Sequence, residues 1–218
     1  VTWMKLRHQN IHELYGYTTA GPYGFSLVLP FLEKGDLRAY RKEEPTVSRT
    51  SSLVDVVRGL RYLHGQDPPI AHGDMRPVCS AVHITMSYHT GLMQGLLEYQ
   101  TDGWSESIMD PFCSRWFAPE VLNPDSFGIP HYLPYMTPEA DIYAFGMVAY
   151  WIYADREPFS DMRNPYRIAT SVLAGGRPPH PGPEADSAKP YGRSRRGAGR
   201  RTLKNGPFRR YCRANLNC

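Results

Sequence analysis

Two short segments of the chain contain residue types that could do chemistry. Residues 72–77 read His-Gly-Asp-Met-Arg-Pro, and residues 115–120 read Arg-Trp-Phe-Ala-Pro-Glu. Phosphoryl transfer uses such groups, because it needs a carboxylate near the attacking hydroxyl, ligands for a metal, and rigid positioning of both. A loop aspartate alone is more often a turn residue, so the order and spacing of the two segments carry more information than either segment does.

Helices are predicted on both sides of these segments. The clearest covers residues 50–64, with its N-terminal cap expected at Ser51 or Ser52. Its apolar stripe at helical spacing consists of Leu53, Val56, Val57, Leu60 and Leu63. Residues 142–153 are nearly all apolar, which predicts a helix buried on most sides. A further short helix is predicted over residues 166–173.

The N-terminal part has a different pattern. Residues 2–9 are typical of the end of a helix, closed by Asn10. Residues 11–17 and 25–29 alternate or run apolar around a Gly- and Pro-containing turn, which predicts two strands of a hairpin. Asp36 is expected near the start of a short helix.

Taken in order, these segments resemble the protein kinase family, with a preference for its tyrosine-kinase-like members. The matches are residues 59–64 and 70–77 to the helix and catalytic loop, 115–120 to the end of the activation segment, 141–146 to a "DVYSFG" helix start, and 157–160 and 176–179 to the segments that follow. The resemblance implies an α+β, protein-kinase-like fold, mostly the α-helical C-lobe with a remnant of the β-rich N-lobe.

The resemblance also implies site roles. It places Asp74 as the catalytic base, Arg76 where the family has a phosphate-contacting Lys, and His72 in the same loop. It gives Asp141 the task of bracing the backbone of that loop. Glu120 corresponds to a glutamate that pairs with a late arginine, a partner that the sequence does not show, so we expect Glu120 to be exposed or poorly placed.

A nucleotide site is implied at the hinge between the lobes. ATP and Mg²⁺ are the family's cofactors. The hinge residues and their neighbour that would contact the nucleotide are Leu29, Pro30, Phe31, Leu32 and Asp36, with Leu29 as the gatekeeper. The alternative interpretation of this stretch is a strand edge and loop with no ligand.

The chain departs from the family pattern at the expected metal ligands. Cys79 stands where the family has an asparagine, and a thiol suits Mg²⁺ poorly. Glu98 begins Glu-Tyr-Gln where Asp-Phe-Gly is expected, and Asp102 is an alternative remnant of that motif. The Gly-rich loop and strand lysine are expected upstream of Val1.

Two functional hypotheses follow from these matches and departures. One is a protein kinase that phosphorylates Ser, Thr or Tyr hydroxyls of proteins. The other is a pseudokinase that binds protein partners, or a truncated gene product of the same family. Oligomeric state cannot be derived from the sequence.

Charge and composition separate a domain from a tail. Residues 184–218 carry ten Lys and Arg but only two acids, which leaves fifteen basic and nineteen acidic residues in 1–183. We therefore divide the chain into a partial kinase domain (1–32 from the N-lobe and hinge, 33–183 from the C-lobe) and a basic, disordered tail, 184–218. Nucleic acid or another anionic partner could bind only through this tail.

The cysteine content and the lengths of the apolar runs indicate the cellular compartment that we expect for the chain. The four cysteines form no Cys-x-x-Cys pair and are too few for a disulfide framework in a chain of 218 residues. We therefore expect a reduced, intracellular protein, most simply a cytoplasmic one. No run of about eighteen apolar residues predicts a membrane span.

Overall fold

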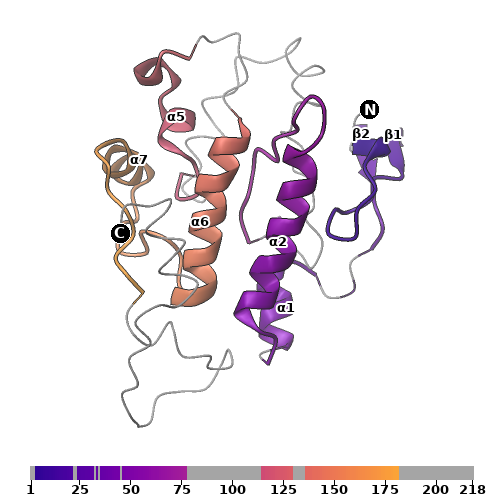
Figure 1. Cartoon of the computed structure of the whole chain (residues 1–218), viewed down its shortest axis with the longest axis horizontal. Coiled ribbons are helices and arrows are strands. Elements are labelled where there is room, and N and C mark those ends of the chain that lie inside the picture. The colour runs from indigo at the N-terminus through magenta and orange to yellow at the C-terminus, as the bar shows by residue number, and fades with distance from the viewer. Residues whose placement is uncertain are drawn as a thin grey trace.

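The computed structural model describes residues 3–21, 24–31, 33, 35–44, 46–77, 114–129 and 136–181. The basic tail, 184–218, lies outside these ranges. The elements along the chain are a 3₁₀ turn η1 (Trp3–Lys5), strands β1 (Gly16–Gly21) and β2 (Gly24–Val28), helices α1 (Leu37–Glu43) and α2 (Arg49–His64), α5 (Pro119–Leu122), the 3₁₀ turn η2 (Pro124–Phe127), α6 (Pro138–Ala154) and α7 (Pro165–Leu173). Helices with one small sheet confirm the α+β class (Figure 1).

The N-terminal segment forms less regular structure than the sequence predicts. Only Trp3–Lys5 is helical within residues 3–10, and Leu6 donates its N–H to the Trp3 carbonyl at 3.0 Å. Trp3 and Leu6 are both buried, and the three-residue spacing of a 3₁₀ turn places them on one side. The predicted helix end is therefore a single tight turn.

The hairpin begins later than predicted. Strand β1 pairs antiparallel with β2 from Gly16, opposite Val28, and the pairing is irregular before Gly21 meets Gly24. Ile11 is buried in the core as part of an extended segment that precedes the strand. The prediction of a strand over residues 11–17 was wrong in its bounds, because apolar residues there serve packing outside the sheet.

Helix α2 confirms the predicted helix over 50–64. Its cap, however, is Ser48, whose side chain accepts a hydrogen bond from the Ser51 N–H. Within the predicted stripe Val56, Leu60 and Leu63 are buried, whereas Val57 is 44% exposed. The buried face is therefore narrower than the predicted stripe.

Helix α6 is the central helix and begins four residues earlier than predicted. Thr137 caps it by accepting a hydrogen bond from the Ala140 N–H at 3.2 Å, and Pro138 occupies the first turn. Residues 144–152 are all buried, as predicted for this helix. In Figure 1, α6 lies beside α2 on one side and faces α5 and α7 on the other.

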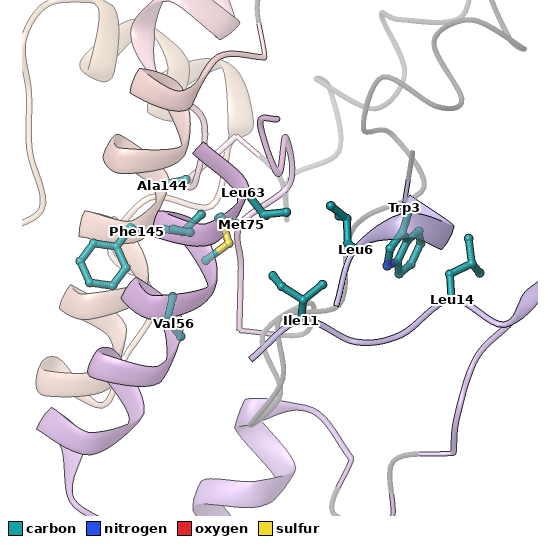
Figure 2. Close-up of a cluster of buried hydrophobic side chains, with 10 residues drawn as sticks. Trp3, Leu6, Ile11, Leu14, Val56, Leu63, Met75, Ala144 and Phe145 are labelled. Atoms are coloured by element: carbon teal, nitrogen blue, oxygen red, sulfur yellow. The ribbon is translucent and has the colours of Figure 1, made fainter. Parts of the chain in front are cut away.

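A hydrophobic cluster joins the N-terminal segment to the helices (Figure 2). Its buried members are Trp3, Leu6, Ile11, Leu14, Val56, Leu60, Leu63, Met75, Ala144 and Phe145. Met75 lies within residues 72–77, so the same cluster holds that loop against α2 and α6. Within the described ranges no helix is long and apolar enough to cross a membrane.

Candidate catalytic loop and its supports

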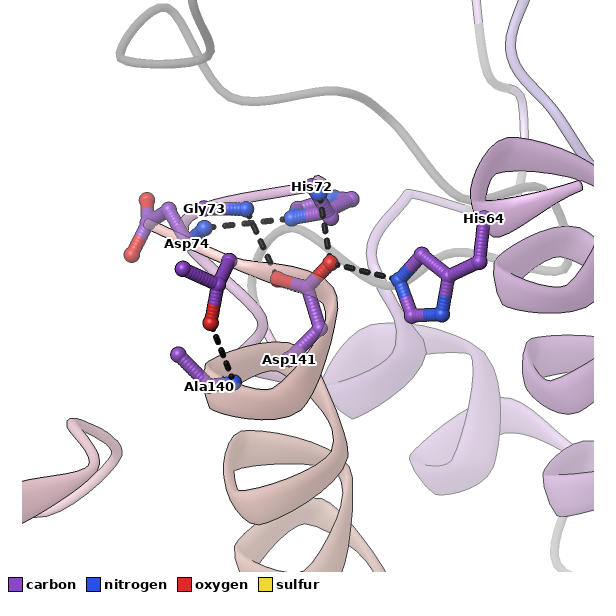
Figure 3. Close-up of polar contacts among 7 residues, drawn as sticks. His64, His72, Gly73, Asp74, Ala140 and Asp141 are labelled. Atoms are coloured by element: carbon purple, nitrogen blue, oxygen red, sulfur yellow. Dashed lines mark hydrogen bonds and ion pairs between the residues drawn. The ribbon is translucent and has the colours of Figure 1, made fainter. Parts of the chain in front are cut away.

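Asp141 holds the backbone of the candidate catalytic loop. Its Oδ2 accepts a hydrogen bond from the His72 N–H at 2.6 Å, and its Oδ1 accepts one from the Gly73 N–H at 2.9 Å (Figure 3). The residue is only 2% exposed. A buried carboxylate is tolerated when donors surround it, and here both oxygens are bonded to the loop. The contact expected of Asp141 is therefore present.

His64 is a third donor to the same carboxylate. Its Nε2 lies 2.8 Å from Asp141 Oδ2, and the His64 side chain is 18% exposed. Because a carboxylate oxygen can only accept, Nε2 carries the hydrogen in this contact. The last residue of α2, the first turn of α6 and the loop thus meet at one carboxylate.

The turn of the loop depends on Gly73 and His72. Gly73 has φ of +80°, a conformation that glycine adopts readily and other residues rarely adopt. His72 is fully buried, and its Nδ1 accepts a hydrogen bond from the Asp74 N–H at 3.2 Å. His72, predicted among the catalytic residues, is placed inside the loop as a support for the Asp74 backbone.

Asp74 and Arg76 form an ion pair within the loop. Asp74 Oδ2 lies 3.0 Å from both Arg76 Nε and the terminal Arg76 NH2 nitrogen. The Asp74 side chain is 8% exposed and that of Arg76 27% exposed. Two donors on one oxygen fix the orientation of the carboxylate, so the structure brings these two predicted site residues together.

The hinge residues are only partly described. Leu29 packs against the N-terminal hydrophobic cluster, the Pro30 carbonyl oxygen lies 3.0 Å from His12 Nε2, and Phe31 is 89% exposed. Leu32 lies outside the described residues. Asp36, placed in the nucleotide site by resemblance, caps α1 by accepting a hydrogen bond from the Ala39 N–H at 2.8 Å.

The predicted metal ligands, Cys79 and Glu98, also lie outside the described residues. Within the described ranges no group of three His, Cys, Asp or Glu side chains could hold a metal ion. Asp74, the one predicted site carboxylate in the described loop, has its Oδ2 bonded to Arg76. The thiol of Cys79 is a poor ligand type for Mg²⁺, which prefers oxygen ligands.

Glu120 is half-buried in the first turn of α5 and lies near Tyr143 of α6. Burial raises the pKa of the Tyr143 hydroxyl to about 12; the charge of Arg177 opposes this shift, and the charge of Glu120 adds to it. The Arg177 guanidinium lies 5.2 Å from the centre of the Tyr143 ring. A cation therefore lies near Tyr143, whereas no cationic partner was expected near Glu120 from the sequence.

Arg115 anchors the second chemical segment, and sequence reasoning missed this role. Its guanidinium donates to the carbonyls of Pro158 and Phe159 at 2.9 and 3.0 Å, and lies 3.3 Å from the Glu157 carboxylate. Glu157 also pairs with Arg38 of α1 at 3.1 Å. The anchor is a buried arginine that donates to backbone carbonyls of another loop, and no sequence pattern marks such a contact.

Known proteins resemble the chain over most of its length. A family model described as "Protein tyrosine and serine/threonine kinase" matches residues 2–188. The serine/threonine-protein kinases VIK and CTR1 of Arabidopsis thaliana are 27% and 26% identical to it over 80% and 77% of the chain. Mouse serine/threonine-protein kinase WNK3 is 28% identical over 79% of the chain.

The chain spans only part of these relatives, namely 39% of VIK, 20% of CTR1 and 10% of WNK3. The family match itself extends over far more than half of the chain. It covers the loop with Asp74, the segment with Arg115 and the helix with Asp141 in one alignment. The chain belongs to the protein kinase family.

Proposed function

We propose that this chain is part of a domain that transfers a phosphoryl group to the hydroxyl of a protein substrate. The observation that carries the proposal is the pair of hydrogen bonds from the His72 and Gly73 N–H groups to Asp141. They fix the backbone next to Asp74, so the Asp74 carboxylate has a defined position. Phosphoryl transfer requires such a positioned carboxylate near the attacking hydroxyl.

Each loop residue has a separate task in this proposal. Asp74 accepts the proton of the attacking hydroxyl, and the Arg76 contacts at 3.0 Å hold Oδ2 in place. Arg76 is partly exposed and offers a positive charge to an incoming phosphate. A bound ATP would supply the phosphoryl group. Because the thiol of Cys79 is a poor ligand for Mg²⁺, we assign no step of the reaction to a metal.

The names of the relatives support serine and threonine as acceptors, since VIK, CTR1 and WNK3 are all called serine/threonine-protein kinases. The carboxylate of Asp74 can accept a proton from a serine, threonine or tyrosine hydroxyl, so its geometry does not itself select among these phosphate acceptors. The cysteine usage favours a reduced, intracellular setting for the reaction.

A non-catalytic role in binding protein partners is the second candidate. It is favoured by Cys79 at a position where an oxygen ligand is expected, and by the ion pair that neutralises Asp74. A protein of this kind would keep the brace at Asp141 for the stability of its fold. The two candidates differ in whether Asp74 affects any phosphate transfer.

Transfer of labelled phosphate from ATP to casein tests the proposal on the whole chain, in the presence of Mg²⁺ or Mn²⁺. We expect Asp74→Asn to lower the rate by roughly 100-fold or more, as for loss of a general base. The matched control is Asp55→Asn, at a partly exposed α2 carboxylate paired with Arg58, which should leave the rate unchanged. Incorporation that survives Asp74→Asn would refute Asp74 as the proton acceptor, and no incorporation by the unaltered chain would refute catalysis and favour the binding role.

A further inference from the structure

A buried histidine touches the backbone of the hinge. His12 is 5% exposed, and its Nε2 lies 3.0 Å from the carbonyl oxygen of Pro30. A carbonyl oxygen can only accept, so His12 is the donor and its Nε2 carries the hydrogen. Neither motif resemblance nor periodicity assigns His12 any role.

The position of His12 is fixed from its own backbone. The indole Nε1 of Trp3 donates to the His12 carbonyl at 2.8 Å in a buried contact. The neighbouring side chains of Ile11 and Leu14 belong to the buried cluster, and Figure 2 shows Trp3 between Leu6 and Leu14. The imidazole therefore has little room to leave the hinge carbonyl without disturbing the core.

The chemistry of Pro30 limits how a purine could bind there. Proline has no backbone N–H, so its main chain offers only a carbonyl acceptor. The Watson–Crick edge of adenine has one donor, the 6-amino group, and one acceptor, N1. Any main-chain hydrogen bond between Pro30 and adenine must therefore run from the 6-amino group to the oxygen that His12 already contacts.

We propose that His12 is a specificity-determining residue of the nucleotide site, because it competes with the 6-amino group of a purine for the Pro30 carbonyl. The inference rests on the proposed function, since it assumes that the ATP of the proposed reaction binds with its base against the Pro30 carbonyl. A carbonyl oxygen has two lone pairs, so the competition weakens the adenine contact and does not abolish it. The site thereby loses part of its preference for a 6-amino purine.

A purely structural tether is the simpler interpretation of the same contact. The hydrogen bond would then only hold the hinge near the cluster against which Leu29 packs. Loss of a tether would change the affinity for all nucleotides alike. Competition at the Pro30 oxygen would instead change the affinity only for bases that carry the 6-amino donor, so the two interpretations differ in base dependence.

Isothermal titration of the full chain with two nucleotides measures that difference. The probes are ATP and purine riboside triphosphate, which has hydrogen in place of the 6-amino group and keeps N1 as an acceptor. His12→Leu removes the donor, His12→Gln retains one, and Trp3→Phe removes the adjacent indole bond but leaves His12 in place. His12→Met replaces His12→Leu if the latter does not fold.

We expect His12→Leu to tighten ATP binding roughly three- to tenfold, the value of one neutral hydrogen bond, and to change binding of the 6-hydrogen analogue less than about twofold. His12→Gln should resemble the unaltered chain, and Trp3→Phe, which releases the His12 backbone but keeps its imidazole, should tighten ATP binding less than His12→Leu does. Equal shifts for both probes in His12→Leu, or no shift, would overturn the role of His12 alone. No binding of either probe to any variant would overturn the proposed function as well.

Discussion

Replacing Asp141 by Asn tests whether its carboxylate supports the catalytic loop. The amide has nearly the same volume, so no cavity forms, but one of its two polar atoms is a donor. Of the buried His72 and Gly73 N–H groups, at 2.6 and 2.9 Å from the carboxylate, one then faces an N–H group and loses its acceptor. An unsatisfied buried donor costs about 1–3 kcal/mol, and the remaining bond loses its charge assistance, worth about 1 kcal/mol.

The expected loss for Asp141→Asn is therefore about 2–4 kcal/mol of the free energy of unfolding. This is a large fraction of the about 5–15 kcal/mol that stabilises a typical domain. His64 adds little to the figure, because its side chain is 18% exposed and water can replace the lost bond.

Urea unfolding followed by tryptophan fluorescence measures this difference. The control is Glu139→Gln, which removes an exposed carboxylate from the same first turn of α6. Glu139→Gln should lower the free energy of unfolding by at most about 1 kcal/mol, the value of a favourable charge near a helix N-terminus. If Asp141→Asn costs no more than Glu139→Gln, the brace contributes nothing beyond helix electrostatics, and the reasoning fails.

Two further changes test the other supports. Arg115→Met should lower the free energy of unfolding by about 1–3 kcal/mol, since it leaves the Pro158 carbonyl without its donor, whereas the Phe159 carbonyl keeps the Met162 N–H. Arg38→Met, at a more exposed partner of Glu157, should lower it by less than about 1 kcal/mol, and equal losses in urea unfolding would contradict the anchor. Folding raises the pKa of Tyr143 from 10.0 to about 12, so its stabilising contribution is complete below pH 10 and is lost as the pH rises through 12. The free energy of unfolding, measured in urea, should therefore fall more steeply from pH 10 to 12 for the unaltered chain than for Tyr143→Phe, by up to about 3 kcal/mol. Parallel plots of this free energy against pH for the two proteins would contradict the prediction.

The helices could be predicted largely because their apolar residues repeat at helical spacing. Residues 50–64 and 166–173 were predicted almost as they occur in α2 and α7. The start of α6 was missed because its first turn, Pro138 to Asp141, is not apolar, and periodicity finds only apolar faces. Thr137 followed by proline is a cap signal that would have given the correct start.

The partners of the site residues could not be derived in the same way. His12 and Pro30 are 18 residues apart, and Arg115 and Pro158 are 43 apart. Each contact depends on how loops fold back onto the core. Loops have no periodic signal, and a backbone carbonyl has no residue type that marks it as an acceptor. Only the resemblance to a family gave the contact between Asp141 and the loop.

The supports of the loop and the chemistry of the loop are separate parts of this molecule. The two carboxylate oxygens of Asp141 accept hydrogen bonds from His64 and from the backbone N–H groups of His72 and Gly73. None of these bonds involves a residue that was predicted to bind metal. Retention of the brace therefore supports a defined position for Asp74, but both the catalytic and the binding role would keep it. Evidence about catalysis must come from Asp74, because its carboxylate is the proposed proton acceptor and it takes no part in the hydrogen bonds to Asp141.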